Sequence, residues 1–365
     1  MSDPTGPGSS SHPALEEYLN TLLPSSNRSS LRTSVLPNLI ASISAVARTL
    51  RGAHDVSAVG SANAFGDDQL NVDVQAEQAV RDAIARCPAI VTASSEEDPV
   101  ERSSPSTSTS TSTSTSTPET AAASSTAAEL YTVAFDPLDG SSIIAPNWTI
   151  GTIIGVWDGP TALGVPPRTH QVAALLGVCG PRTSVLVALR LPGTTGEGGT
   201  CFEVALSSAT DDTDTDTDTD TSNALVIRRS IRFSPPPSIK TRYFAPANLR
   251  AAAGDPRYLT LITQYIEQQY TLRYSGGLVP DVAHMLSKGH GVYVSPVTGG
   301  TKAKLRRLYE LCPVAMVVEC AGGKAVDPVD GGEVLEREVG GVEERGGLVC
   351  GTGVEVEGAV RALVG

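Results

Sequence analysis

Apolar residues recur at helical spacing along the first part of the chain. Between residues 13 and 51 they fall every three or four positions, which predicts two amphipathic helices separated by a turn near Ser26. The same spacing predicts a third helix over 72–86, followed by a short apolar strand over 89–93. We expect the two N-terminal helices to cover one face of a sheet.

Two long polar tracts interrupt this pattern. Residues 103–125 are almost entirely Ser and Thr, and they cannot bury enough apolar surface to offset the entropy of ordering, so we expect disorder. We interpret this tract as an expanded loop, because the cost of closing a loop rises only slowly with its length. The second tract ends in an Asp-Thr run, and we expect residues 207–223 to form an acidic linker or loop.

Strands and helices alternate on both sides of the second tract. The predicted strands are 131–135, 184–191, 201–206 and 315–319, and the predicted helices are 255–269, 279–288 and 301–311. This alternation is typical of α/β proteins. We predict two domains, an N-terminal one over 12–206 and a C-terminal one over 224–365.

Charge and composition narrow the class of function. The 365 residues carry a formal net charge of -13, which argues against nonspecific binding to nucleic acid or to anionic membranes. No apolar run reaches membrane-spanning length, and the N-terminus shows no signal sequence, so we expect a cytoplasmic protein. Six cysteines without a CxxC pair predict reduced, mostly buried thiols.

The strongest chemical signal is an octet, FDPLDGSS, that follows the strand predicted over 131–135. Asp136 and Asp139 can hold divalent cations, and the carbonyl of Leu138 adds a hard oxygen ligand that suits Mg²⁺. After them come Gly140, Ser141 and Ser142, whose small side chains and backbone N–H groups can cradle a phosphate. Asp-Pro and Asp-Gly by themselves only mark turns, so the interpretation depends on the whole octet.

Three further motifs accompany the octet: GDDQLNVD at 66–73, SSEED at 94–98 and KLRRLYE at 304–310. Together, and in this order, the four motifs resemble those of the fructose-1,6-bisphosphatase family. Shorter runs at 149–157, 180–183, 240–248 and 270–277 resemble its sedoheptulose-1,7-bisphosphatase branch in particular. Each acidic or basic run alone would be an ordinary solvated segment, so the joint occurrence carries the resemblance.

The resemblance implies a layered α-β-α-β-α sugar-phosphatase fold with the metal site at the junction of its two domains. The N-terminal domain would hold the metal and 1-phosphate site, and the C-terminal domain would bind the rest of the substrate. The implied activity is Mg²⁺-dependent hydrolysis of the 1-phosphate of a ketose bisphosphate, with sedoheptulose 1,7-bisphosphate favoured. Fructose 1,6-bisphosphate or dual specificity is the alternative, and a non-catalytic metabolite-binding relative is a third.

The resemblance also implies roles for individual residues. The implied metal ligands are Glu96, Glu97, Asp136, the Leu138 carbonyl, Asp139 and Glu310, holding two or three Mg²⁺, with Mn²⁺ as an alternative ion. The residues implied to orient and deprotonate the attacking water are Asp67, Asp73 and Glu97. The implied substrate-binding residues are Asp139, Gly140, Ser141 and Ser142 at the 1-phosphate, and Asn248, Tyr274 and Lys304 at the distal end. We expect a homodimer or homotetramer.

Overall fold

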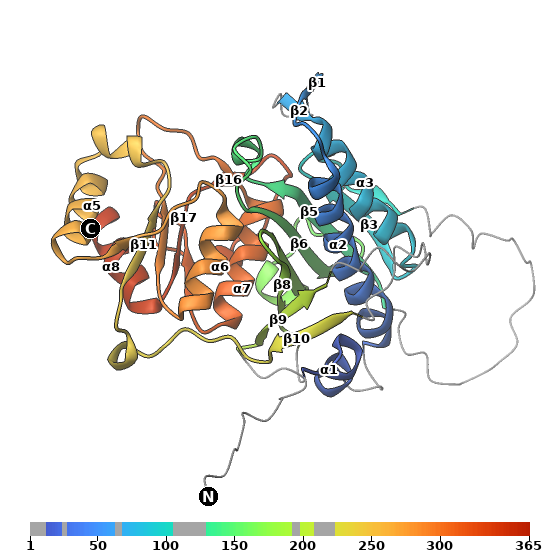
Figure 1. The fold of residues 1–365 in the computed structure, drawn as a ribbon. Helices are drawn as coiled ribbons and strands as arrows, with labels where there is room; N and C mark the ends of the chain where they lie inside the picture. Colours follow the sequence, from blue (N-terminus) through green and yellow to red (C-terminus); the bar gives the residue numbers. More distant parts are fainter. Residues whose placement is uncertain (1–11, 24–27, 63–67, 105–128, 192–197, 208–222) are drawn as a thin grey trace, which may run out of the picture.

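Two β-sheets form the centre of the fold (Figure 1). The computed structural model describes residues 12–23, 28–62, 68–104, 129–191, 198–207 and 223–365. The first sheet has eight strands in the order β10-β9-β8-β7-β6-β5-β3-β4, and the second has five in the order β12-β11-β13-β17-β15. In the first sheet β3 and β5 are parallel, and the other neighbours are antiparallel.

The strands of the first sheet are β3 (Ile90–Ser95), β4 (Arg102–Ser103), β5 (Tyr131–Asp139), β6 (Ile150–Asp158), β7 (Gln171–Cys179), β8 (Thr183–Leu189), β9 (Thr200–Leu206) and β10 (Ala224–Arg228). Those of the second are β11 (Tyr243–Pro246), β12 (Thr271–Leu272), β13 (Val292–Ser295), β15 (Lys324–Val326) and β17 (Leu348–Gly351). Two small pairs are β1 (Ala58–Ala62) with β2 (Asp68–Leu70), and β14 (Leu305–Arg306) with β16 (Arg345–Gly346).

The helices are α1 (Leu15–Leu22), α2 (Leu36–Gly52), α3 (Asn71–Ala85), α4 (Pro167–His170), α5 (Pro256–Glu267), α6 (Leu278–Lys288), α7 (Cys312–Cys320) and α8 (Gly353–Leu363). One π-helical turn (Leu31–Val35) leads into α2, and another (Arg307–Leu311) leads into α7. The predicted N-terminal helices, the helix over 72–86 and the strand over 89–93 are therefore confirmed to within a few residues.

Helices and sheets stack in five layers. The helices α1, α2 and α3 pack on one face of the first sheet, around one hydrophobic core. Between the two sheets lie α6 and α7, which contact strands of both (Figure 1). On the outer face of the second sheet lie α5 and α8, over a third core. The layered α-β-α-β-α fold that the resemblance implied is confirmed.

The position of α7 between two sheets explains a wrong prediction. The apolar run over 315–319, predicted as a strand, lies inside α7, whose residues from Cys312 to Val318 are all buried. A helix that packs against sheets on opposite sides has no polar face, so its sequence shows no amphipathic period and reads like a buried strand.

The helix predicted over 301–311 is also wrong in its first half. Helical structure begins at Arg307, while Leu305 and Arg306 form β14 and pair with β16. The partner strand lies about forty residues further along the chain, so a contact between distant segments overrides the local helical pattern here.

The sheet order also bears on the domain boundary. The predicted C-terminal domain begins at residue 224, yet β10 pairs antiparallel with β9 in the first sheet. We therefore propose that the connection between the two sheets follows Arg228. Most of the predicted acidic linker (207–223) lies outside the described residues, as does most of the tract at 103–125, although Ser103 belongs to β4.

The cysteines and the lengths of the helices bear on two further predictions. All six cysteines are free thiols, and five of them are buried, as the sequence predicted. A search of the described residues finds no helix with the length and apolar character needed to cross a membrane.

Candidate active site

The site is built around a bulge near the end of β5. All nine residues of β5 are buried, and the strand runs through the octet as far as Asp139 instead of ending at residue 135. Asp136 pairs with Ile153 and Asp139 with Gly151, so three steps along β5 match two along β6. Residues three apart on a regular strand point to opposite faces, and the extra residue of a bulge corrects this difference. Both carboxylates can therefore serve one site.

Glu310 joins these two carboxylates from the other half of the chain. It lies on the π-helical turn before α7, and this turn contacts β5. One carboxylate oxygen from each of Asp136, Asp139 and Glu310 lies within 4.8 Å of the others, and all three residues are buried. The structure thus brings together three of the metal ligands that the resemblance implied.

Burial and mutual repulsion disturb the protonation of this cluster. Loss of hydration is the largest cause, followed by the charge of Glu96, and together they raise the pKa of Asp136 and of Glu310 well above the usual range. Burial raises the pKa of Asp139 to about 6. Such a cluster fits a divalent cation, because hard oxygen donors suit Mg²⁺ and the ion offsets the repulsion between buried carboxylates.

Asp139 also joins the two halves of the fold. Its Oδ1 accepts a hydrogen bond from the backbone N–H of Leu278 at 3.1 Å, and its Oδ2 accepts one from Val279 at 2.6 Å. Both donors lie in the first turn of α6, where backbone N–H groups have no partner within the helix. The sequence did not predict this contact, which holds α6 directly over the end of β5.

The turn after β5 matches the expected phosphate cradle in position. Gly140 has a φ of 95°, and a Cβ there would lie 3.3 Å from the Cα of Gly277. A side chain would therefore be strained and crowded at this point. Ser141 and Ser142 follow in a short 3₁₀ turn with exposed side chains. Gly140, Ser141 and Ser142 thus follow directly after Asp139 of the acidic cluster, and the two serines are open to solvent.

The structure places two of the three proposed water-activating residues near each other. The Asp73 carboxylate accepts a hydrogen bond from the N–H of Leu70 at 2.8 Å. Burial is the main reason that its pKa is raised to about 6, and the charges of Glu97 and Glu96 add to the effect. Glu97 accepts a hydrogen bond from the Gln69 side-chain amide at 2.5 Å. Asp67, the third, lies outside the described residues.

Glu96 is held by an arginine that the sequence did not single out. Its Oε1 accepts a hydrogen bond from Nε of Arg306 at 2.7 Å, and the Arg306 side chain is only 1% exposed. The backbone N–H of the same arginine donates to Glu310. In the sequence this residue belonged to a basic run that alone suggests an ordinary helix face. A strand pairing with β16, which the sequence does not reveal, buries it instead.

Two of the three predicted distal residues line a basic pocket. A cavity of about 590 Å³ is lined by Asn248, Arg250, Thr301, Lys302, Ala303, Lys304 and Arg345. The structure thus brings Asn248 and Lys304 to one pocket, and it adds three basic side chains that sequence reasoning missed, Arg250, Lys302 and Arg345. Tyr274 is a half-exposed residue that is not among the lining residues, but its hydroxyl interacts with the backbone of Asn248. Lys302 could have been found from its spacing to Lys304, whereas Arg345 depends on the pairing of β14 with β16.

The chain is similar to known proteins along most of its length. Two family models match, Fructose-1-6-bisphosphatase, N-terminal domain, over residues 100–207, and Fructose-1-6-bisphosphatase, C-terminal domain, over 238–364. The chain is 33% identical to chloroplastic sedoheptulose-1,7-bisphosphatase of Triticum aestivum, over 94% of this chain and 75% of that protein. It is 31% identical to class 1 fructose-1,6-bisphosphatase of Citrifermentans bemidjiense, over 74% and 69%.

A solved structure is similar as well. A Toxoplasma gondii protein assigned to the sedoheptulose-1,7 bisphosphatases superposes with a TM-score of 0.75 and 30% identity, covering 96% of this chain and 98% of that one.

Proposed function

Because the chain belongs to the fructose-1,6-bisphosphatase family, we propose that its acidic cluster hydrolyses the 1-phosphate of a ketose bisphosphate with Mg²⁺, and that sedoheptulose 1,7-bisphosphate is the preferred substrate. The chain is a sugar bisphosphatase and hence a phosphoric monoester hydrolase. The metal ion, the bond that is cleaved and the preference between sugars are the proposed parts.

The observation that carries the proposal is the convergence of Asp136, Asp139 and Glu310 from two halves of the chain. The residues that would hold the metal are Glu96, Glu97, Asp136, the Leu138 carbonyl, Asp139 and Glu310. When bound there, two or three Mg²⁺ ions, or Mn²⁺ in their place, would neutralise phosphate charge and lower the pKa of a coordinated water. A binding-only protein has no need of so repulsive a cluster, which speaks against the non-catalytic alternative.

The chain's own groups supply the remaining steps. Asp73 and Glu97, with Asp67 as the third member of the set, would orient the attacking water and accept its proton. A base with a pKa of about 6, such as Asp73, is mostly ionised at neutral pH and is still basic enough to take a proton. The backbone N–H groups from Asp139 to Ser142 would hold the 1-phosphate in line for attack.

The basic pocket supports a substrate with a second phosphate. None of the residues that line it is acidic, and Arg250, Lys302, Lys304 and Arg345 can all donate charge-assisted hydrogen bonds. Asn248 and Tyr274 would contact the sugar and fix its distance from the metals. One extra hydroxymethylene lengthens sedoheptulose relative to fructose, so this distal end must decide the preference, because the reacting end is the same in both sugars.

Steady-state kinetics on both bisphosphates test the proposal. We expect phosphate release from sedoheptulose 1,7-bisphosphate with the higher kcat/KM, and loss of release from both sugars when a chelator removes the metal. A higher kcat/KM for fructose 1,6-bisphosphate would overturn the proposed substrate preference and leave the bisphosphatase activity unchanged. If neither sugar releases phosphate in the presence of Mg²⁺, the result would contradict the proposal and favour the non-catalytic alternative.

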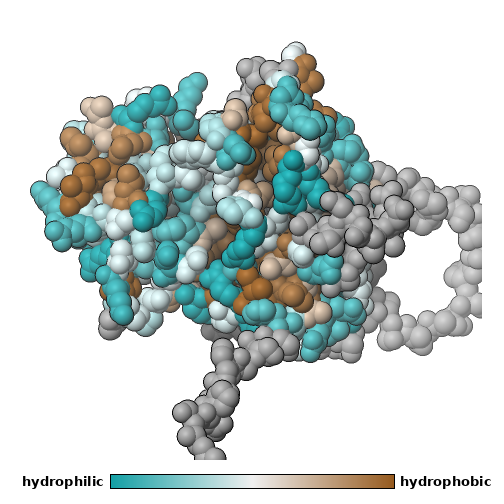
Figure 2. Space-filling model, viewed as in Figure 1, coloured by the Kyte–Doolittle hydropathy of each residue, from teal (hydrophilic) through white to brown (hydrophobic). Residues whose placement is uncertain are grey.

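We also propose a homodimer or homotetramer in the cytoplasm. Apolar side chains gather over α5 (Figure 2), where Leu259 is 51% and Ile266 is 65% exposed. Leu272, in the edge strand β12, is 52% exposed. An apolar surface of this kind is typical of contacts between subunits. Light scattering on a size-exclusion column tests the assembly, and a monomer across the micromolar range would contradict it.

A further inference from the structure

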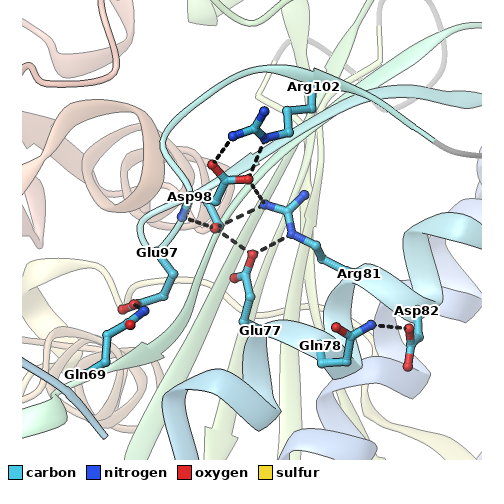
Figure 3. A network of polar contacts seen from close by, with 9 residues as sticks. Gln69, Glu77, Gln78, Arg81, Asp82, Glu97, Asp98 and Arg102 are labelled. Carbon is cyan, nitrogen blue, oxygen red and sulfur yellow. Dashed lines mark hydrogen bonds and ion pairs between the residues drawn. The ribbon is translucent and has the colours of Figure 1, made fainter. Parts of the chain in front are cut away.

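One face of α3 carries a polar network beneath the proposed base. Asp73, Glu77 and Arg81 are spaced four residues apart, so they lie along the same side of the helix. Asp73 lies near the Glu96–Glu97 turn, and Glu77 and Arg81 lie one and two turns further along. Figure 3 shows Glu77 and Arg81 pointing toward Asp98 and the turn that follows β3.

That turn is closed on itself between Ser95 and Asp98. The N–H of Ser95 donates to the carbonyl of Asp98 at 3.1 Å, and the N–H of Asp98 donates to the Ser95 hydroxyl oxygen at 2.9 Å. The residues enclosed by these two bonds are Glu96 and Glu97. The contacts that hold Ser95 and Asp98 therefore fix the backbone position of the two proposed metal ligands.

Arg81 and Glu77 hold both ends of the turn. Glu77 Oε1 accepts the Ser95 hydroxyl at 2.8 Å and the Nε–H of Arg81 at 2.6 Å. The Nη2 of Arg81 reaches Asp98 Oδ2 at 3.5 Å. Arg102 then binds Asp98 with two hydrogen bonds, of 2.7 and 2.9 Å.

Arg81 also contacts the strand that carries Asp136. Its guanidinium carbon lies 5.7 Å from the centre of the Phe135 ring, within the range of a cation–π contact. Phe135 immediately precedes Asp136, and its carbonyl accepts the N–H of Glu96 at 3.0 Å. The Arg81 side chain thus touches α3, the turn after β3 and the middle of β5.

We propose that Arg81 is a positioning residue that sets the spacing between the Glu96–Glu97 turn and Asp136, and so the affinity of the site for divalent cations. The inference rests on the proposed function, whose metal site it concerns. The network contains two cations, Arg81 and Arg102, and two carboxylates, Glu77 and Asp98, so its formal charges cancel. It therefore acts on the metal ligands through geometry and not through net charge.

The test measures Mn²⁺ binding to substrate-free protein by calorimetry, together with circular dichroism, Tm and kcat as a function of Mg²⁺. Arg81→Met keeps the length and packing of the side chain and removes its hydrogen bonds. Changes to residues that orient metal ligands cost about ten- to a hundredfold in metal affinity, and we expect that loss in Arg81→Met. Arg81→Lys should recover part of the lost affinity. The compact lysine ammonium group can pair with Glu77 or with Asp98, but it cannot hold both.

Asp82→Asn is the matched control. Asp82 is the next residue on α3, exposed, and bonded only to Gln78 at 2.6 Å among the contacts drawn in Figure 3. We expect wild-type Mn²⁺ binding in this variant.

The outcomes separate the inference from the proposed function. A folded Arg81→Met that binds Mn²⁺ like the wild type overturns the positioning role and leaves the bisphosphatase proposal intact. If Arg81→Met does not fold, Asp98→Asn decides, because it keeps the shape of the turn and removes the charge that Arg81 holds. Wild-type Mn²⁺ affinity in Asp98→Asn would then overturn the inference. A wild-type protein that neither binds Mn²⁺ nor releases phosphate overturns both.

Discussion

Arg306 and Glu96 are 210 positions apart in the chain, and their side chains form an ion pair with 2.7 Å between Nε and Oε1 at the centre of the site. The arginine comes from β14 in the C-terminal half and the glutamate from the turn after β3. This pair and the Asp139 contacts with α6 both cross the junction of the two halves. The acidic cluster and the packing of the two halves therefore depend on the same residues.

Arg306→Met should destabilise the metal-free protein, and added Mg²⁺ should reverse part of this destabilisation. Removal of one partner of a buried ion pair costs about 3 to 5 kcal/mol, and here it leaves Glu96 beside Asp136 and Glu310 without its counter-charge. Bound Mg²⁺ would supply positive charge at the same place, so saturating Mg²⁺ should restore part of the lost stability. Urea unfolding with and without Mg²⁺ measures both effects. Equal stability of variant and wild type in chelator would contradict the assignment.

Glu97→Gln should abolish most turnover without unfolding the protein. The change keeps the shape of the side chain and removes charge from the cluster. General-base and metal effects are each worth on the order of a hundredfold or more, so kcat should fall by at least that factor. Phosphate release under saturating substrate and Mg²⁺ measures the change, with Asp82→Asn as control. A folded variant whose kcat stays within a few-fold of wild type would show that Glu97 has another role.

Lys302→Met and Arg345→Met should weaken substrate binding and leave turnover nearly unchanged. Both residues line the basic pocket and neither belongs to the acidic cluster, so we expect them to contact the distal part of the substrate. A hydrogen bond to a charged group contributes about 1.5 to 3 kcal/mol, which corresponds to roughly a ten- to hundredfold rise in KM. Lys288→Met, at the exposed end of α6, is the control. A fall in kcat at constant KM would place these residues elsewhere in the reaction.

Asp281→Asn should stabilise the protein increasingly as the pH rises. Burial is the main cause that raises the pKa of Asp281 to about 7, well above the usual range of an aspartate, although hydrogen bonds from Ser275 lower it. The folded protein therefore holds this proton more tightly than the unfolded chain does. The resulting stabilisation is complete below the unfolded pKa and is lost as the pH rises through about 7.

An amide has no such charge to bury, so the variant should gain on the order of 2 to 4 kcal/mol relative to wild type between about pH 5 and pH 8. Thermal unfolding at a series of pH values measures the difference. A Tm difference that does not change with pH would mean that the Asp281 carboxyl titrates normally.

The sequence predicted local features well where neighbouring residues carry the signal. The amphipathic helices at the N-terminus show a 3.6-residue period because one side faces the first sheet and the other faces water. The octet at 135–142 places two carboxylates, a glycine and two small side chains within eight positions, so its chemistry is visible without the fold. Family resemblance through four such motifs was sufficient for the layered architecture and the class of enzyme.

Only the tertiary structure decided how distant segments meet. The helix α7 has no amphipathic period because sheets cover it on both sides. Arg306 is buried because β14 pairs with β16. Asp139 caps α6, a helix that begins 139 residues later. The sequence by itself determined which residues could bind a metal and a phosphate, since that depends on the chemistry of side chains and on local turns. The fold decided which arginines join them and how the two halves are held together, because contacts between distant residues leave no periodic trace in the chain.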